Sequence, residues 1–283
     1  MVCGGILNGY EKFSSPSLLR CLSCGMLFAQ QRPSRVELEQ LYTRDYFKSG
    51  DYQKPGYLDY QYDEMLIKKS FARRLKVIMR FVASGKLLDV GCATGFCLEV
   101  AQELGLEPYG VELSSFAASC AQERFGTHVF CGELPQADFP QEWFDVITAW
   151  DYIEHVPDPV EAIQHMHALL RTGGILALTT PDASSIVAKL TGARWLGFKE
   201  QEHLCYFSRE NLAFLLKRIG FSVVSLGTTG KYVDGALIID RLGHYNALLG
   251  RLGQRLLPST IKKASFYVNP FDIVFVIAKK INN

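Results

Sequence analysis

The stretch "GKLLDVGCATGF", residues 85–96, decides the fold of this chain. Its first half is a short apolar run typical of a buried strand, and its second half is a glycine-rich turn leading into a helix. Gly91 and Gly95 permit backbone conformations, and a close approach of a ligand, that a side chain would prevent. Their spacing is too short for the G-x-G-x-x-G pattern, so a nicotinamide dinucleotide is not the automatic ligand.

Length and composition favour one main folded domain with a small appendage. The chain has 283 residues, of which 48% are hydrophobic and 21% are charged. Its formal net charge of +1 gives no global attraction to nucleic acid. No apolar run approaches the roughly 20 residues that span a bilayer, so we expect no stable membrane insertion and a cytoplasmic protein. The cysteines, which are single apart from one C-x-x-C pair, fit that compartment.

Strand and helix patterns alternate from about residue 65 onward. Apolar runs predict seven strands, at residues 86–90, 107–113, 127–134, 144–150, 175–180, 221–226 and 271–280. Boundary signals mark three helices. Gly85 ends a run from Ser70, Asp158 precedes a helix that starts with a proline and ends at Gly173–Gly174, and Ser208 precedes a helix that Gly220 ends. Such alternation implies parallel pairing, so we predict an α/β fold with a doubly wound, mostly parallel sheet.

The sequence also predicts how the chain is divided. Residues 1–64 are rich in tyrosine and turn residues and form an appended arm, whereas residues 65–283 form the main domain. Two insertions interrupt that domain, at about 182–207 and about 231–267. The second is helical, with an apolar stripe and only basic charges from Arg241 to Lys263. We expect it to pack on the chain itself or in a homodimer, the alternatives being an anionic substrate or a lipid surface.

Two acidic residues indicate the ligand of the glycine turn. Glu112 ends the second strand, where a carboxylate can accept both hydroxyls of a ribose. Ligands of an open parallel sheet lie outside the carboxyl ends of its strands, so the turn and Glu112 together indicate an adenosine-containing molecule. Asp89 would repel a pyrophosphate but can orient an ammonium group. We therefore favour S-adenosylmethionine.

These motifs resemble the class I S-adenosylmethionine-dependent methyltransferases. The resemblance rests on "LLDVGCATG", "GVELS", "FDVITAWDYIEHVPDP" and "LLRTGGILALTTP", in that order, and covers about residues 65–230 and the last strand. It implies a sheet of seven strands, the last antiparallel and placed beside the fifth. It also implies a cradle for the methionyl part at Asp89, Gly91, Cys92, Ala93, Gly95 and Phe96.

The same resemblance assigns the rest of the cofactor. Glu112 would hold the ribose and Glu133 the adenine amine, and backbone around Trp150 would border the sulfonium. The adenine would lie between two apolar walls, Leu113 and Leu134. Tyr57 and Tyr60 are candidates to lie on the cofactor, or to attach the N-terminal arm to the core through their large apolar faces.

A second resemblance concerns the arm. "RCLSCGMLF", "LYTRDYF" and "GYLDY" are similar to the zinc-ribbon-like N-terminus of a methyltransferase subfamily associated with sugar, polysaccharide and natural-product pathways. Zinc would be held by Cys3, Cys21 and Cys24, but tetrahedral zinc needs a fourth ligand, which the arm does not supply. Either the zinc site is degenerate, or the given sequence starts after the missing ligand, or another group supplies the fourth ligand.

The predicted function is methyl transfer from S-adenosylmethionine to a small-molecule acceptor, by O-methylation of a hydroxyl in one of those pathways. We nominate His203 as the base and His155 as the second choice, because an imidazole can remove a proton near neutral pH. Helix capping or packing is the plain alternative for both. Two other functions stay open: an NAD-type oxidoreductase, and a non-catalytic protein that only senses the cofactor.

Overall fold

The computed structural model describes residues 6–9, 18–30, 37, 64–199 and 202–282. Three residues with predicted roles lie outside this part of the chain: Cys3, Tyr57 and Tyr60. Among the described helices, none combines the length and apolar character needed to cross a membrane.

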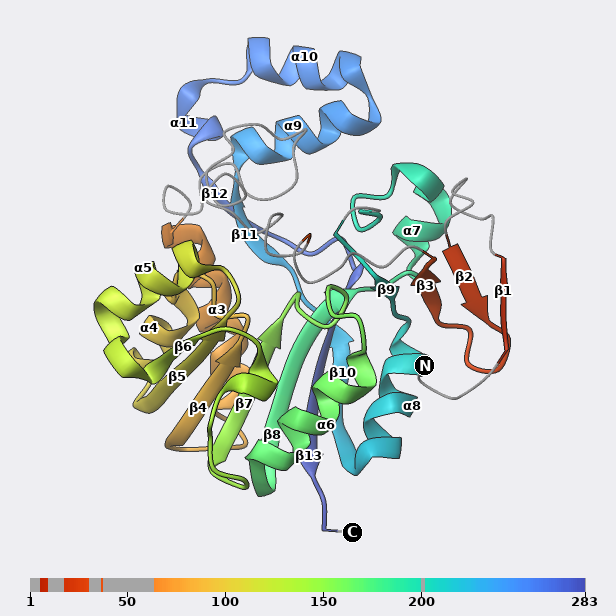
Figure 1. Ribbon diagram of the computed structural model, residues 1–283. Coiled ribbons are helices and arrows are strands. Elements are labelled where there is room, and N and C mark those ends of the chain that lie inside the picture. The colour runs from red at the N-terminus through yellow and green to blue at the C-terminus, as the bar shows by residue number, and fades with distance from the viewer. Residues whose placement is uncertain (1–5, 10–17, 31–36, 38–63, 200–201, 283) are drawn as a thin grey trace.

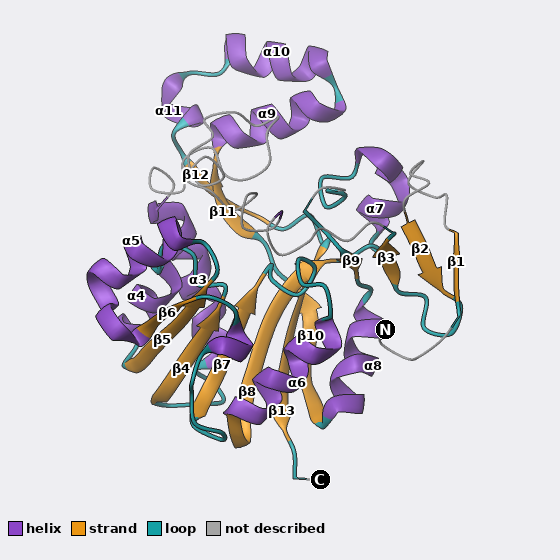
Figure 2. Ribbon diagram, in the orientation of Figure 1, coloured by secondary structure: helices purple, strands orange, loops and turns teal. Residues whose placement is uncertain are grey.

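A seven-stranded sheet forms the centre of the molecule (Figures 1 and 2). Its strands, in spatial order, are β10 (Phe221–Thr228), β13 (Ile273–Lys280), β8 (Leu170–Pro181), β7 (Phe144–Trp150), β4 (Gly85–Val90), β5 (Leu106–Glu112) and β6 (Val129–Cys131). The pairs from β8 to β6 are parallel, whereas β13 runs antiparallel to both β8 and β10. The predicted fold class, with its last strand antiparallel beside the fifth, is confirmed.

Helices cover both faces of this sheet (Figure 2). One face carries α3 (Glu64–Ile78), α4 (Phe96–Glu103) and α5 (Ser115–Phe125), and the other carries α6 (Pro159–Leu169) and α8 (Arg209–Ile219). Successive side chains of a strand point to opposite faces, so Leu87 joins the core under α3 and α4 while Leu88 joins the core under α6 and α8. Each fully buried leucine contributes about 1.5–3 kcal/mol.

Two helices begin where their capping residues predict, and one of them also ends there. The Asp158 carboxylate accepts hydrogen bonds from the backbone amides of Val160 and Glu161 at the start of α6. The Ser208 hydroxyl accepts from the amide of Asn211 at the start of α8, and Gly220 ends that helix in the left-handed region, at φ 112°.

Two predicted helix boundaries were wrong. The first helix starts at Glu64 and ends at Ile78, and Gly85 is not its cap but the first residue of β4. Gly85 is needed there because a Cβ would lie 2.2 Å from the carboxylate of Asp145, which accepts a hydrogen bond from the Lys86 amide. Helix α6 stops at Leu169, before the Gly173–Gly174 pair, since β8 already starts at Leu170.

A second, small sheet joins the N-terminal segment to the first insertion. Its order is β1 (Leu7–Gly9), β2 (Leu18–Cys21), β3 (Leu27–Ala29) and β9 (Cys205–Tyr206), and all its pairs are antiparallel. Strand β9 and helix α7 (Ile186–Thr191) belong to the insertion predicted at 182–207. The sequence did not predict this pairing of distant segments.

The second insertion contains strands as well as the predicted helices. Strands β11 (Lys231–Asp234) and β12 (Ser265–Val268) pair at its base, and α9 (Gly235–Tyr245), α10 (Ala247–Leu256) and α11 (Ser259–Lys262) lie between them. Helices α9 and α10 meet at two glycines, because a Cβ on Gly250 would lie 2.5 Å from the Cα of Gly243.

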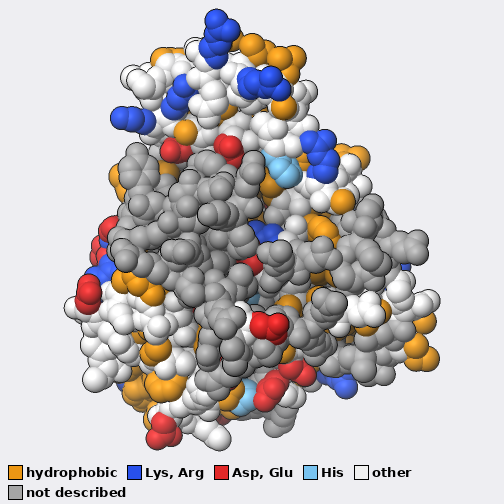
Figure 3. All heavy atoms as spheres, turned by 45° about the horizontal axis from the view of Figure 1, so that its top comes forward, with side chains coloured by type: hydrophobic (Ala, Val, Ile, Leu, Met, Phe, Trp, Pro, Cys, Tyr) orange, Lys and Arg blue, Asp and Glu red, His pale blue; other side chains and the backbone are white. Residues whose placement is uncertain are grey.

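The outer surface of this insertion mixes apolar and basic side chains (Figure 3). Its exposed apolar residues include Leu242, Leu248, Leu249, Leu252, Leu256 and Ile261. The homodimer through residues 231–267 stays a prediction, as do its alternatives, an anionic substrate and a lipid surface.

The close contact between β5 and the turn that follows β4 gives a test of the fold. A Cβ on Gly110 would lie 2.6 Å from the sulfur of Cys92, so we expect Gly110→Ala to lower the free energy of unfolding by about 1–3 kcal/mol. Gly227, in β10, has open space around its Cβ position, so Gly227→Ala should change that free energy by less than about 0.5 kcal/mol. Urea unfolding measures both, and equal effects of the two substitutions would contradict the packing described.

Candidate active site

The predicted cofactor residues meet at the carboxyl edge of the sheet. The turn at residues 91–95 follows β4, Glu112 is the last residue of β5, and Trp150 is the last residue of β7. Strand β4 lies between β5 and β7 in the sheet. The loops after these three strands are therefore neighbours, in the position where open parallel sheets bind their ligands.

The glycine turn has a backbone that requires its glycines. Gly91 and Gly95 lie in the left-handed region, at φ 76° and φ 89°, and Ala93 shares that region at φ 49°. The amides of Gly91 and Cys92 both donate to the carbonyl oxygen of Val111, at 2.9 and 3.1 Å. A Cβ on Gly91 would come within 3.0 Å of the ring of Tyr152, so this turn and the loop after β7 are in contact.

Glu112 fastens the turn to the end of β5. Its carboxylate is buried and accepts hydrogen bonds from the backbone amides of Ala93, at 2.9 Å, and Ser114, at 2.8 Å. Burial raises the pKa of Glu112, and these amide bonds lower it in part. Each carboxylate oxygen has a second lone pair, so both oxygens can still accept a hydroxyl.

Asp89 is a buried acid directly before the turn. It is 1% exposed, and the hydroxyl of Thr148 on β7 donates to its Oδ1 at 2.6 Å. Burial raises the pKa of Asp89 to about 7, an effect that the Thr148 bond opposes. A neighbouring ammonium group would favour the ionised form, because opposite charges attract strongly where water is excluded.

The remaining residues predicted to bind the cofactor differ in their exposure. Cys92, Phe96 and Leu134 are buried in the core, Leu113 and Glu133 are partly exposed, and Glu133 precedes a short 3₁₀ turn. The indole of Trp150 packs in the core beside Phe71 and Phe275 and donates to the sulfur of Cys97. Only the backbone of Trp150 is therefore placed to border a ligand.

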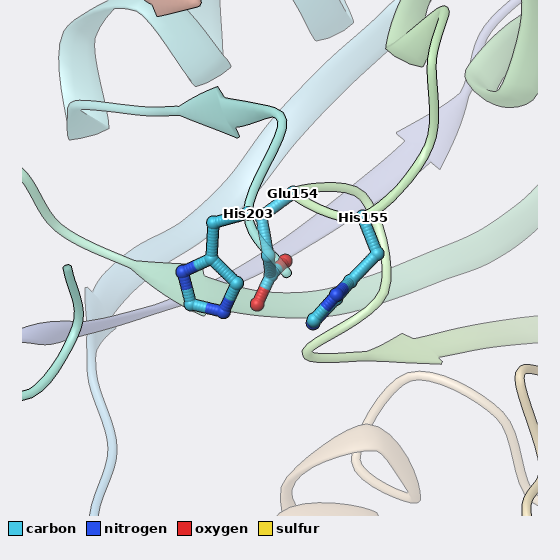
Figure 4. Close-up of side chains that lie close together, drawn as sticks. All are labelled: Glu154, His155 and His203. Atoms are coloured by element: carbon cyan, nitrogen blue, oxygen red, sulfur yellow. The ribbon is translucent and has the colours of Figure 1, made fainter. Parts of the chain in front are cut away.

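The two candidate histidines lie side by side although they are far apart in the sequence. The ring centroids of His155 and His203 are 4.7 Å apart, with an interplanar angle of 87°. Figure 4 shows the carboxylate of Glu154 between the two rings. We call Glu154, His155 and His203 the buried triad, and their nitrogen and oxygen ligand atoms all lie within 4.8 Å of one another.

Backbone hydrogen bonds hold the two halves of the triad together. The amides of Leu204 and Cys205 donate to the carbonyl oxygen of Glu154, at 2.7 and 3.1 Å. The amide of Ala29, at the end of β3, donates in turn to the carbonyl of Leu204. The loop after β7, the end of the first insertion and the N-terminal sheet are thus joined directly.

Each histidine has one ring nitrogen occupied by the backbone. Nδ1 of His203 lies 2.9 Å from the carbonyl oxygen of Gly197, which can only accept, so Nδ1 carries the hydrogen and Nε2 has a lone pair. Burial lowers the pKa of His155 to about 4, and a hydrogen bond to the backbone of Glu202 opposes this. Burial, followed by the charges of His155 and Lys199, lowers the pKa of His203 well below its ordinary value.

Glu154 is the residue that sequence reasoning missed. It is 1% exposed, and neither carboxylate oxygen has a well-formed hydrogen bond among the described residues, although the nearby Thr180 hydroxyl lowers its pKa in part. Burial and the negative charge of Asp151 raise the pKa of Glu154 to about 8. The signal available in the sequence was its position next to His155, but an acid beside a histidine is common.

The predicted zinc site is only partly within the described residues. Cys21 and Cys24 lie on the tight turn between β2 and β3, where the amide of Gly25 donates to the carbonyl of Cys21 and Gly25 has φ 72°. Both cysteines could supply thiolate ligands from one turn, as zinc sites require. Zinc binding there stays a prediction, because Cys3 is outside the described part.

Comparison with known proteins identifies the domain. Residues 62–226, more than half of the chain, match the family described as "Methyltransferase domain". Ubiquinone biosynthesis O-methyltransferases are similar over shorter stretches. The protein from Actinobacillus pleuropneumoniae is 34% identical over 105 residues, which are 34% of this chain and 45% of that protein. The protein from Albidiferax ferrireducens is 29% identical over 128 residues, 41% of this chain and 49% of that protein.

The chain thus spans about half the length of the curated relatives it matches. Solved structures agree on the fold. A SAM-dependent methyltransferase of Archaeoglobus fulgidus has a TM-score of 0.53 at 18% identity, covering 81% of this chain and all of that one. One from Thermotoga maritima has a TM-score of 0.52 at 20% identity, covering 78% and 94%. The predictions of a methyltransferase domain and of S-adenosylmethionine as its cofactor are confirmed at the level of the family.

Asp89 should make stability depend on pH. Folded protein keeps the Asp89 proton up to about pH 7, whereas the unfolded chain releases it near the ordinary pKa of 3.8, so burying the acid costs stability increasingly as pH rises. We expect the free energy of unfolding of Asp89→Asn, relative to that of the wild type, to increase by about 2 kcal/mol between pH 5 and pH 7.5. Urea unfolding at both pH values measures this gain. Asp240→Asn, on α9, is the control, and a gain from Asp89→Asn that is the same at both pH values would contradict the assignment.

Glu112 should govern cofactor affinity. A glutamine there keeps one acceptor oxygen but cannot accept from both amides and a ribose, and hydrogen bonds to a charged group are worth about 1.5–3 kcal/mol. We expect Glu112→Gln to weaken S-adenosylmethionine binding by roughly 10- to 100-fold in calorimetry. Glu107, at the other end of the same strand, is the matched control, and Glu107→Gln should bind like the wild type. Unchanged affinity in Glu112→Gln would remove this residue from the cofactor site.

Proposed function

This chain belongs to the methyltransferase domain family, and on that premise we propose that it transfers the methyl group of S-adenosylmethionine to a hydroxyl oxygen of a small molecule. The observation that carries the proposal is the arrangement at the carboxyl edge, where the glycine turn, Asp89 and Glu112 converge beside the buried triad.

In the proposed complex, different residues at the carboxyl edge of the sheet bind different parts of S-adenosylmethionine. Asp89 holds the ammonium group of the methionyl part, the turn admits that part close to the backbone, and Glu112 accepts the ribose hydroxyls. Glu133, with Leu113 and Leu134, surrounds the adenine. This assignment leaves the sulfonium near the backbone of Trp150, on the side where the loop after β7 begins.

Two observations favour oxygen as the methyl acceptor. The buried triad offers a neutral imidazole nitrogen, Nε2 of His203, as a proton acceptor close to the end of β7. The curated relatives are named as O-methyltransferases. Burial lowers the pKa of His203 well below its ordinary value, which favours the neutral imidazole that a proton acceptor requires and also makes it a weaker base.

The reaction itself needs little chemistry from the protein. The hydroxyl oxygen displaces the sulfonium in line, forming the O–C bond while the electron pair of the C–S bond stays on sulfur. Holding the two reactants in that geometry can supply about 7–11 kcal/mol of barrier reduction. Loss of the hydroxyl proton is the step in which the triad takes part.

The N-terminal segment suggests which chemical class of acceptor to test first. Its β3–β9 pairing places the arm beside the segment that carries His203, so the arm can form part of the acceptor site. The resemblance of the arm to a subfamily from sugar, polysaccharide and natural-product pathways makes hydroxyl-rich molecules of those classes the first acceptors to screen. Release of S-adenosylhomocysteine measures turnover for each.

His203 can be tested once an acceptor is found. We expect His203→Ala to lower kcat by at least tenfold while the Kd for S-adenosylmethionine changes less than twofold, because its role begins with the acceptor. His165, on the outer side of α6, is the matched control, and His165→Ala should leave both quantities unchanged. Unchanged turnover in His203→Ala would exclude it from the mechanism.

The same measurements separate the two rival functions. An NAD-type oxidoreductase would bind NAD in preference to S-adenosylmethionine in calorimetry, a result that Asp89 argues against. A protein that only senses the cofactor would bind S-adenosylmethionine yet release no S-adenosylhomocysteine with any acceptor.

A further inference from the structure

We propose that Glu154, His155 and His203 bind a divalent transition-metal ion, which in turn binds the acceptor hydroxyl. Two imidazoles and one carboxylate form a ligand set that suits zinc and its first-row neighbours. The binding site is argued from the geometry of the triad alone, whereas its role in methyl transfer rests on the function proposed above.

The positions of the ligand atoms fit one ion. Two ligands about 2.0–2.2 Å from a tetrahedral ion lie about 3.4 Å apart. The triad atoms lie within 4.8 Å of one another, so small side-chain rotations would bring them to that spacing. Figure 4 shows all three groups pointing into the same space from two segments. Those segments are already fixed to each other by the amides that donate to the Glu154 carbonyl.

The carboxylate of Glu154 is the strongest indication of a missing partner. A buried polar group without a hydrogen bond is costly, and a buried charge needs a counter-charge. Both oxygens of Glu154 lack a well-formed hydrogen bond among the described residues, and the nearby Thr180 hydroxyl is neutral, so it supplies no counter-charge. The nearby lysines are engaged elsewhere, since Lys231 pairs with Asp151 at 2.6 Å and Lys199 with Glu202 at 3.0 Å. A divalent cation would supply the counter-charge.

The histidines are oriented as metal-binding histidines usually are. Such residues typically donate their second ring nitrogen to a carbonyl or carboxylate, which fixes the ring and leaves the other nitrogen for the ion. Nδ1 of His203 bonds the Gly197 carbonyl, which directs the lone pair to Nε2. His155 has a corresponding hydrogen bond to the backbone of Glu202.

Three protein ligands leave at least one position open, as in catalytic metal sites. The loop that carries Glu154 and His155 contacts the glycine turn through Tyr152, so the triad lies near the proposed cofactor site. With the ion bound, Nε2 of His203 is a ligand and no longer the proton acceptor. An acceptor hydroxyl on the ion would instead lose its proton to solvent water, because a bound cation stabilises the alkoxide. The alkoxide oxygen then forms the O–C bond, and sulfur keeps the electrons of the broken C–S bond.

The test measures zinc uptake without any acceptor. Untagged full-length protein is stripped with a chelator, equilibrated with zinc chloride, desalted and analysed for metal content. We expect the wild type and His165→Ala to retain one more zinc ion per chain than Glu154→Gln, His203→Ala or His155→Gln. Because the comparison is a difference, zinc held at Cys21 and Cys24 does not affect it.

Binding of S-adenosylmethionine shows in parallel that each variant is folded, since the triad lies outside the cofactor residues. If the triad variants bind the cofactor and retain as much zinc as the wild type, the metal site is refuted. The catalytic role has a separate test in an acceptor assay: stripped wild type should lose at least tenfold in kcat and regain it with zinc. Full turnover without metal would overturn that role and leave the proposed methyl transfer intact, whereas metal uptake without any methyl transfer would overturn the proposed function and leave the site.

Discussion

The carboxylate of Glu112 is the contact on which the proposed cofactor site depends. It accepts the amides of Ala93 and Ser114, and so ties the turn after β4 to the end of β5. The Val111 carbonyl holds the start of the turn through the amides of Gly91 and Cys92, and Glu112 adds the link at Ala93. The Glu112 carboxylate is buried and held by two amides, so its remaining lone pairs point in a fixed direction. The binding site is in this sense preorganised for a ligand.

A second link, also made by the backbone, positions the triad. The Glu154 carbonyl accepts hydrogen bonds from two amides of the segment that follows His203. The carbonyl of Leu204, in that segment, accepts a hydrogen bond from an amide of β3. The N-terminal sheet is therefore a brace for the segment that carries His203. A domain boundary at residue 64 would divide this brace. The loop after β7 and the segment after His203 lie in the main domain, whereas β3 lies in the arm.

Both sites contain acids in surroundings that disfavour their charge. Burial raises the pKa of Asp89 to about 7 and that of Glu154 to about 8. Such groups lower the stability of the ligand-free protein at neutral pH, and they occur where a positively charged partner can reverse the cost. In the proposed complex the ammonium of the cofactor is the partner for Asp89, and in the proposed metal site a divalent ion is the partner for Glu154.

The sequence by itself determined the parts of this protein that local signals govern. Period-two and period-3.6 apolar patterns, with caps such as Asp158 and Ser208, predicted the alternation of strands and helices, and the glycine turn with Glu112 predicted the cofactor edge. Only the tertiary structure decided that β9 pairs with β3 and that Glu154 lies between His155 and His203. The physical reason is that these contacts join segments far apart in the chain, so no local pattern encodes them, and burial changes the chemistry of Glu154 only after those segments have packed.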